Sequence, residues 1–278
     1  MPWLRRIALP IGLLFLIAAF VVLSFPYDRI ANALSARSQT WTGISLEIDE
    51  ISPTMSWAGP GLEARGARIA TPNTDPLVLT SLFVRPSWSL GWLLGDPRIF
   101  LEIEGGPLGR LEGKVGLAHG GSWQAHLEDV QADVLPLQRL VPGLAMGGRL
   151  TGDLDVALDE LGRPQGTVNV VFLDGMLTAP GLPLPLPFER LAGDIEFGDE
   201  HLADVRELSL RGPVLDATLR GTITPAERRG SEPLALEMEL ERVSPSLQPF
   251  LHGLGIPLVR RGPTRLVITG TLARPTFR

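Results

Sequence analysis

The chain has 278 residues, with 25 basic and 31 acidic side chains and a formal net charge of −6. It contains no cysteine, which excludes disulfides, thiolate metal sites and cysteine nucleophiles. The basic residues are not clustered, and binding to phosphate needs grouped Lys and Arg, so we expect no nucleic-acid partner. At this length the chain has room for one large or two small domains with a sizeable core.

The N-terminus carries the first recognisable element. Arg5 and Arg6 precede an uncharged apolar run over residues 7–25, which as a helix would extend roughly 28 Å, close to the thickness of a bilayer core. Trp3 and Tyr27 stand at its two ends, where amphipathic rings favour the membrane interface.

These features predict four regions along the chain. Residues 1–6 are a cytoplasmic tail, 7–26 a transmembrane anchor, 27–40 a helical stalk and 41–278 an exported β-rich domain. Basic residues favour the cytoplasmic side of a membrane, which places the body on the far side. A cleaved signal peptide ending at Ala31-Asn32-Ala33 is the alternative, and it exports the body equally.

Beyond residue 40 the pattern is that of β-strands. Alternation or short apolar runs predict strands at 44–49, 62–69, 77–84 and 99–103, the last of them buried. The longest alternations, over 150–158 and 215–223, are apolar or glycine at every second position and largely polar in between. Prolines and glycines lie mostly between these segments, and 180–187 reads as an extended, proline-rich connector.

Five strands share one motif, in which a glycine stands between two apolar residues at alternate positions. They cover 111–115, 150–154, 191–195, 219–223 and 268–272. Side chains alternate across a strand, so each motif predicts one apolar face that includes the glycine and one polar face. The glycines have two interpretations, which are compatible: they let a sheet bend, or they open space on the apolar face for a hydrocarbon guest.

A longer repeat relates residues 111–154 to residues 219–272. In each segment a glycine strand precedes a second strand, a short helix-like piece and a further glycine strand. Leu-Gln and Gly-Leu pairs recur in both with a constant offset of 110 residues, which indicates duplication of one unit.

No constellation in the sequence carries catalytic or metal chemistry. His119, His126, His201 and His252 are not at ligand spacing, and no nucleophile elbow, phosphate loop or dinucleotide fingerprint occurs. Acidic pairs such as Asp153/Asp155 alternate with core residues, which is typical of a solvated strand face. We therefore predict no enzyme, with no catalytic, metal-binding or cofactor-binding residues.

Few predicted helices are available to cover the apolar sheet face. It must be buried by curling of the sheet, by a second sheet or by something other than protein. If the face forms a groove, the residues expected to line it are Leu111, Val115, Leu150, Leu154, Val156, Leu219, Ile223 and Ile268.

The anchor, the glycine-punctuated strands and the segments 25–30, 60–69 and 269–277 together resemble the AsmA-like envelope proteins. Within that group, the chain in its short length most resembles general secretion pathway protein N of the type II secretion system. The resemblance implies a mainly β fold, with a curved, glycine-punctuated antiparallel sheet like a half-barrel or groove behind an N-terminal transmembrane helix. It also implies a single-pass inner-membrane protein whose bulk lies in the periplasm.

For function, the resemblance implies a non-enzymatic accessory component of type II secretion without an active site or a cofactor. Its partners would be the inner membrane and other secretion components or the secretin. The wider AsmA-like group implies the alternative, a lipid-binding or lipid-transfer protein whose apolar groove holds phospholipid.

Overall fold

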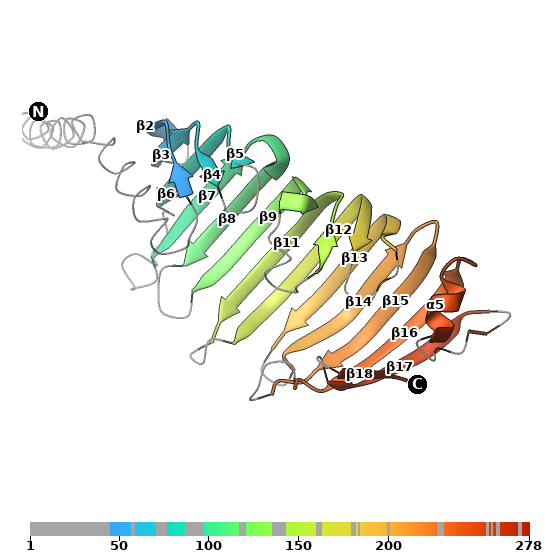
Figure 1. The fold of residues 1–278 in the computed structure, drawn as a ribbon. Coiled ribbons are helices and arrows are strands. Elements are labelled where there is room, and N and C mark those ends of the chain that lie inside the picture. Colours follow the sequence, from blue (N-terminus) through green and yellow to red (C-terminus); the bar gives the residue numbers. More distant parts are fainter. Residues whose placement is uncertain are drawn as a thin grey trace, which may run out of the picture. The chain divides into compact units, whose positions relative to one another are not determined.

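The computed structural model describes residues 45–278 apart from short gaps. The gaps are 57–58, 71–76, 87–96, 117–120, 135–142, 160–162, 179–181, 183, 199–200, 227–230, 254–255, 257, 260–261 and 272–273. The predicted anchor at 7–26 and stalk at 27–40 lie outside the described residues. The described chain is mainly β, with antiparallel strands and few helices (Figure 1), which confirms the predicted fold class at that level.

The chain divides into two compact units, and strand β7 (Arg98–Glu104) is shared between them. The first unit contains a small antiparallel sheet of β1 (Ser45–Glu47), β4 (Arg68–Ala70) and β5 (Leu77–Val78). It also contains the antiparallel strands β2 (Glu50–Ser56), β3 (Gly59–Arg65) and β6 (Ser81–Pro86), in the order β2-β3-β6. Its core centres on Ile51 and Ala64.

Two strands predicted in the first unit are wrong as single elements. The segment 62–69 is broken at Gly66, whose φ of +64° lies in the left-handed region that favours glycine. The segment 77–84 divides into β5 and β6 because Leu79 and Thr80 turn between them. The Leu79 N–H donates to the Ala67 carbonyl oxygen at 2.8 Å, and the Thr80 N–H donates to that of Glu104 at 2.9 Å.

The second unit is built on a run of antiparallel strands in the order β8-β9-β11-β12-β13-β14-β15-β16-β17-β18. The bounds are β8 (Arg110–Gly116), β9 (Ser122–Gln131), β11 (Arg149–Leu158), β12 (Pro164–Thr178), β13 (Leu186–Phe197), β14 (Ala203–Arg211), β15 (Leu215–Ile223), β16 (Leu234–Val243), β17 (Thr264–Thr271) and β18 (Arg274–Phe277). The two-residue strand β10 (Ala145–Met146) pairs with the end of β12, and helix α5 (Gln248–Gly253) connects β16 to β17.

The strands of the second unit match the sequence patterns closely. The five glycine motifs lie in β8, β11, β13, β15 and β17, and the alternations at 150–158 and 215–223 are β11 and β15. The segment 99–103 lies in β7, but its residues are only partly buried, so the expectation of a buried strand there is wrong.

The two repeated segments contain the same irregularity in their second strands. In β9 the pairing with β11 shifts between Leu127 and Val130, and in β16 the pairing with β15 shifts between Leu240 and Arg242. These positions belong to the matching sequences at 127–130 and 240–243. The shared bulge is consistent with duplication, which stays a prediction.

Arg149 at the start of β11 links two backbone irregularities on the neighbouring strands. Asp129 in β9 and Asp174 in β12 are the non-glycine residues with positive φ in the described chain, at 56° and 50°. The Arg149 guanidinium lies 3.7 Å from the Asp129 carboxylate and 3.1 Å from that of Asp174. Aspartate tolerates the left-handed region better than most residues, and here both carboxylates contact one cation.

Gly152 is required by the close approach of β12, since a Cβ there would clash with the Asn169 carbonyl oxygen. At Gly193 an added Cβ would meet only side-chain atoms, Leu208 Cδ1 at 3.3 Å and Val170 Cγ2 at 3.5 Å. We expect G152A to lower the free energy of unfolding by about 1–3 kcal/mol through backbone displacement, and G193A to change it by less than about 1 kcal/mol. Urea denaturation followed by circular dichroism measures the free energy of unfolding of both variants. Equal losses of stability in G152A and G193A would contradict the close approach of β12 at Gly152.

Asp216 fastens the turn between β14 and β15. Its Oδ1 accepts a hydrogen bond from the Gly212 N–H at 3.0 Å, and its Oδ2 lies 2.8 Å from the Arg242 guanidinium. Burial alone would raise the pKa of Asp216, but the Gly212 hydrogen bond and the Arg242 charge outweigh it and hold the pKa below its ordinary value of 3.8.

A lowered carboxyl pKa stabilises the fold above the ordinary value, and this stabilisation is lost as the pH falls through the lowered folded value. We therefore expect D216N to be less stable than the wild type at about pH 6 and the difference to shrink below about pH 3. Urea denaturation at both pH values measures the difference. A stability difference between wild type and D216N that stays constant or increases in acid would contradict this role for Asp216.

Candidate binding surface

The register of the second unit places apolar residues of successive strands in continuous rows on one side. Residues directly opposite each other in an antiparallel pair share a face, so one row can be followed from β8 to β18. It consists of Gly113, Ala125, Leu154, Val168, Ile195, Val205, Gly221, Leu236, Ile268 and Phe277. We call the side that carries this row the apolar face, and the opposite side the polar face.

All eight residues predicted to line a groove lie on the apolar face. Leu154 and Ile268 belong to the row above, and the other six fall in parallel rows, by register or by alternation along their strands. Leu150 and Ile268 are buried, whereas Leu111, Val115, Leu154, Val156, Leu219 and Ile223 are partly buried.

Protein covers parts of this face. Leu127, Val130 and Leu150 form a buried cluster with Leu108 and Val134 from short helical turns packed against it. Near the other end of the strand order, Leu240 and Leu266 are buried together with Ile256, and Leu251 of α5 packs against them. The chain itself therefore fills these parts of the apolar face.

At the opposite ends of β8, β9 and β11 the apolar face carries more exposed side chains. Val115, Trp123 and Val156 lie side by side in register, and Leu158 follows on β11. The Trp123 side chain is 61% exposed and Leu158 is 42% exposed. We call these four residues the open apolar patch.

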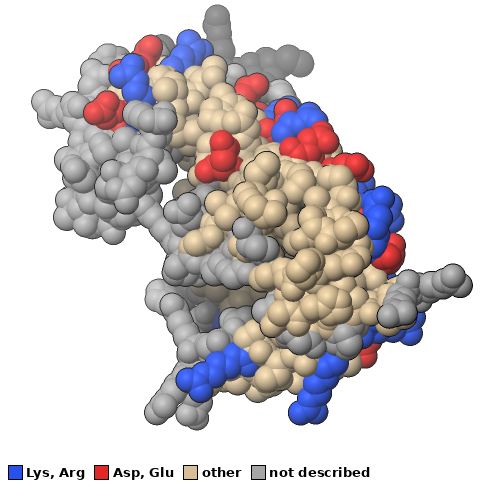
Figure 2. All heavy atoms as spheres, turned by 45° about the vertical axis from the view of Figure 1, so that its right-hand side comes forward, with Lys and Arg blue, Asp and Glu red and all other residues tan. Residues whose placement is uncertain are grey.

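A space-filling view shows that uncharged residues occupy a broad part of the visible surface, with charged residues gathered along its margin (Figure 2).

Two residues of this patch are not among the eight predicted groove residues. Leu158 belongs to the predicted alternation at 150–158, whereas Trp123 was not singled out from the sequence. It alternates with Ala125 and Leu127 along β9, which would have placed it on the apolar side.

The five motif glycines do not leave empty space on the apolar face. A Cβ added at Gly113, Gly152, Gly221 or Gly270 would press on backbone oxygen atoms of the neighbouring strand, and at Gly193 it would contact Leu208 and Val170. Gly221 also has a φ of +131°, a conformation that residues with a Cβ rarely adopt. Close approach of the neighbouring strand accounts for the glycine at 113, 152, 221 and 270.

Ion pairs connect neighbouring strands on the polar face. His126 Nδ1 lies 2.7 Å from Asp153 Oδ1, Arg220 lies 2.6 Å from Glu207 and Arg265 lies 3.4 Å from Glu239. These side chains are mostly more than a third exposed, so each pair contributes little to stability. They form a solvated face, as the alternation of acidic and apolar residues indicated.

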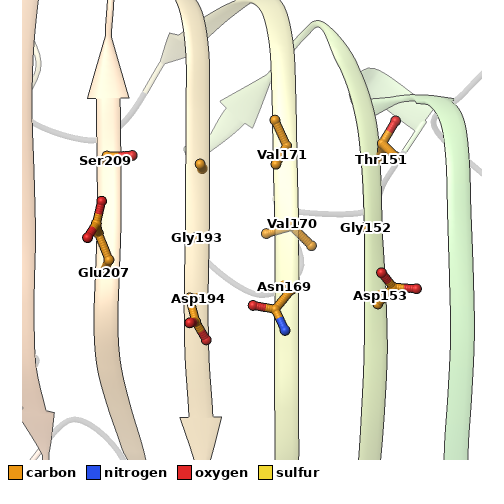
Figure 3. Close-up of a pocket in the computed structure, with 11 residues that line it drawn as sticks. Thr151, Gly152, Asp153, Asn169, Val170, Val171, Gly193, Asp194, Glu207 and Ser209 are labelled. Carbon is orange, nitrogen blue, oxygen red and sulfur yellow. The ribbon is translucent and has the colours of Figure 1, made fainter.

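A shallow concavity of about 420 Å³ lies on the polar face over β11 to β14. Its lining includes a row of Asp153, Asn169, Asp194 and Glu207, which cross the four strands side by side (Figure 3). A second row with Thr151, Val171 and Ser209 runs parallel to it (Figure 3). The concavity is wide and open, and its polar groups are carboxylates, an amide and hydroxyls.

The carboxylates of this concavity differ in their partners. Asp153 is paired with His126, and Glu207 with Arg220. Asp194 stands opposite Glu207 in the register, and its Oδ1 is buried without a hydrogen-bond partner. In the part of the chain that the structure describes, no three His, Asp or Glu residues are placed so that they could hold a metal ion.

The histidines are separated in the fold. His126 is on the polar face of β9, His201 lies just before β14 and His252 is in α5, while His119 falls outside the described residues. The structure therefore does not assemble the three described histidines into one site.

The hydrogen bond to Asp153 raises the pKa of His126 above its ordinary value of 6.5 and outweighs the opposing effect of burial. We expect D153N to lower the His126 pKa, because the charge-assisted bond is lost. A two-dimensional NMR titration of the histidine ring resonances measures this. An unchanged pKa in D153N would show that the pair does not form in solution.

Neither protein-family models, nor curated proteins, nor solved structures gave a match to this chain. Among the described residues, which begin at Ser45, no helix is long and apolar enough to cross a membrane. The exposure of Trp123 and Leu158 makes the open apolar patch the candidate binding surface.

Proposed function

We propose that the protein is a non-enzymatic, inner-membrane-anchored component of type II secretion, and that it binds other secretion components through the open apolar patch. The observation that carries the proposal is the exposure of Trp123 and Leu158 on a face that the chain itself covers at the clusters of Leu150 and Leu266. Exposed apolar clusters bordered by polar residues are typical of interaction sites.

The chemistry of the patch favours a partner rather than a reaction. Trp123, with Val115 and Val156 in register on either side, supplies a large rigid contact of the type that dominates binding energy at interfaces. Acidic and basic groups of the polar face pair with one another between strands, as in His126–Asp153, Arg206–Glu196 and Arg220–Glu207. A binding role fits this division of the two faces.

The secretion system and the location come from the sequence. The segments 25–30, 60–69 and 269–277 resemble general secretion pathway protein N, and the arginine-flanked run at 7–26 is the predicted anchor. Together they support a single-pass protein of the inner membrane with residues 41–278 in the periplasm, where the patch would contact the secretin or another component.

The second candidate is an AsmA-like lipid-binding role. It is favoured by the continuity of the apolar rows, which carry no charged side chain from β8 to β18 in the row that contains Leu154 and Ile268. A curved sheet with such a face would hold acyl chains along it.

Two adjacent positions on β9 give a matched experiment. Trp123 and Gln124 are both exposed and lie on opposite faces. A photo-crosslinking amino acid at 123 should capture a secretion component in intact cells, identified by mass spectrometry, and the same group at 124 should not. Capture of phospholipid at 123 would favour the lipid role instead. Equal capture at both positions, or capture only at 124, would overturn the assignment of the patch.

Substitution tests the same surface through activity. W123D places a charge in the patch but removes little buried area, because Trp123 is 61% exposed. We expect W123D to reduce export of a type II substrate several-fold at an unchanged level of the protein, and Q124A to leave export as in the wild type. Normal export by W123D would contradict the proposal.

A further inference from the structure

The outermost strand of the second unit is short and contains a proline. β18 pairs with β17 through Ile268↔Phe277, Thr269↔Thr276, Gly270↔Pro275 and Thr271↔Arg274. Just beyond it, Val267 and Arg278 exchange both backbone hydrogen bonds, at 2.9 and 3.0 Å. In the described chain β18 stands last in the strand order.

This pair of bonds fixes which way the backbone groups of β18 point. Hydrogen-bonded and non-hydrogen-bonded pairs alternate along an antiparallel ladder. Since Arg278 faces β17, Thr276 and Arg274 face it as well, and the backbone groups of Pro275 and Phe277 point outward. Proline has no N–H, so the outer edge of β18 offers the single N–H of Phe277.

The side chains of β18 also disfavour pairing of another strand at its outer edge. Arg274 and Pro275 are exposed, and charge and proline on an edge strand are the devices that natural sheets use against edge pairing. Phe277 packs against the cluster of Val205, Leu236 and Ile268, which keeps β18 in place over β17.

The first unit shows the same arrangement independently. β2 is outermost in the order β2-β3-β6, and Pro53 stands at its centre, opposite Leu62. Prolines of interior strands stand at or next to strand ends, as Pro164 does at the first residue of β12. Within a sheet, a proline inside a strand is tolerated where its missing N–H would face solvent.

β17 would be a good template for pairing without this cover. It has eight residues, no proline and a row of buried residues at Thr264, Leu266 and Ile268. Such a strand at an edge invites pairing with another chain.

We infer that the proline-bearing outer strands β2 and β18 prevent another chain, including a second copy of this one, from extending the sheets by strand pairing. Copies of the protein therefore do not join through the outer edges of β2 and β18 into a longer apolar surface. This inference does not depend on the proposed secretion or lipid role.

The test restores the missing donor in the full-length chain. P275V and P275A each return an N–H to the outer edge, and the alanine variant carries the test if the larger side chain disturbs the fold. P164V is the matched control, because it makes the same exchange at the start of an interior strand. Analytical ultracentrifugation over a range of concentrations measures the mass of each protein.

We expect the wild type and P164V to keep one mass at all concentrations, and the variants at Pro275 to shift toward twice that mass as concentration rises. Hydrogen–deuterium exchange should show slower exchange at residues 274–278 in the associated form. The inference is overturned if folded P275V and P275A remain monomeric, or if they associate without added protection at 274–278. It is also overturned if the wild type itself associates with protection there.

Discussion

The structure of the second unit depends on keeping one register across all its strands. A slip of a single residue in any strand would turn its apolar side chains to the polar face. The row that includes Leu154 and Ile268 continues through every strand of the order β8-β9-β11-β12-β13-β14-β15-β16-β17-β18, so each strand pair must conserve the same alternation. The bulge in β9 preserves it, because two residues are taken up between Leu127 and Val130 and both side chains stay on the apolar face.

The two faces of this sheet contribute differently to the stability of the fold. Removal of apolar side chains from water on one face supplies most of the favourable free energy, at about 25 cal/mol per Å². The exposed ion pairs of the other face contribute little individually. Like charges stand opposite each other between β13 and β14, at Arg190↔Arg211, Asp194↔Glu207 and Glu196↔Asp204, and Asp194 and Glu207 line the concavity in Figure 3.

Alternation was the most reliable guide from sequence to structure. It placed β11 and β15 within a residue of their observed bounds, and it put the eight groove candidates on one face. The first unit was harder, because its strands are short and Gly66 turns the chain inside a segment that reads as one strand. Coverage of the apolar face could not be predicted either, since it depends on where Leu108, Val134 and Ile256 fold back on it.

The chemically reactive residue types of the sequence do not mark the candidate site. His126 and Asp153 form an exposed pair on the solvated face. In the sequence Trp123 is one of many apolar residues. Its exposure next to Val156 in the folded chain is what distinguishes it. Exposure of an apolar residue is a property of the folded chain and has no signature in the local pattern.

From β11 to β18 every strand pairs with the strand that follows it in the chain. Contacts between strands are therefore local along the sequence, and most of these hairpins close a short loop at a small entropic cost. The connection between β16 and β17 is longer, with residues 244–263 and helix α5 in between. Such a sheet has a low contact order for an all-β protein and can form hairpin by hairpin. It can also gain or lose a hairpin during evolution without rewiring the rest, in the manner of a protein built from repeats.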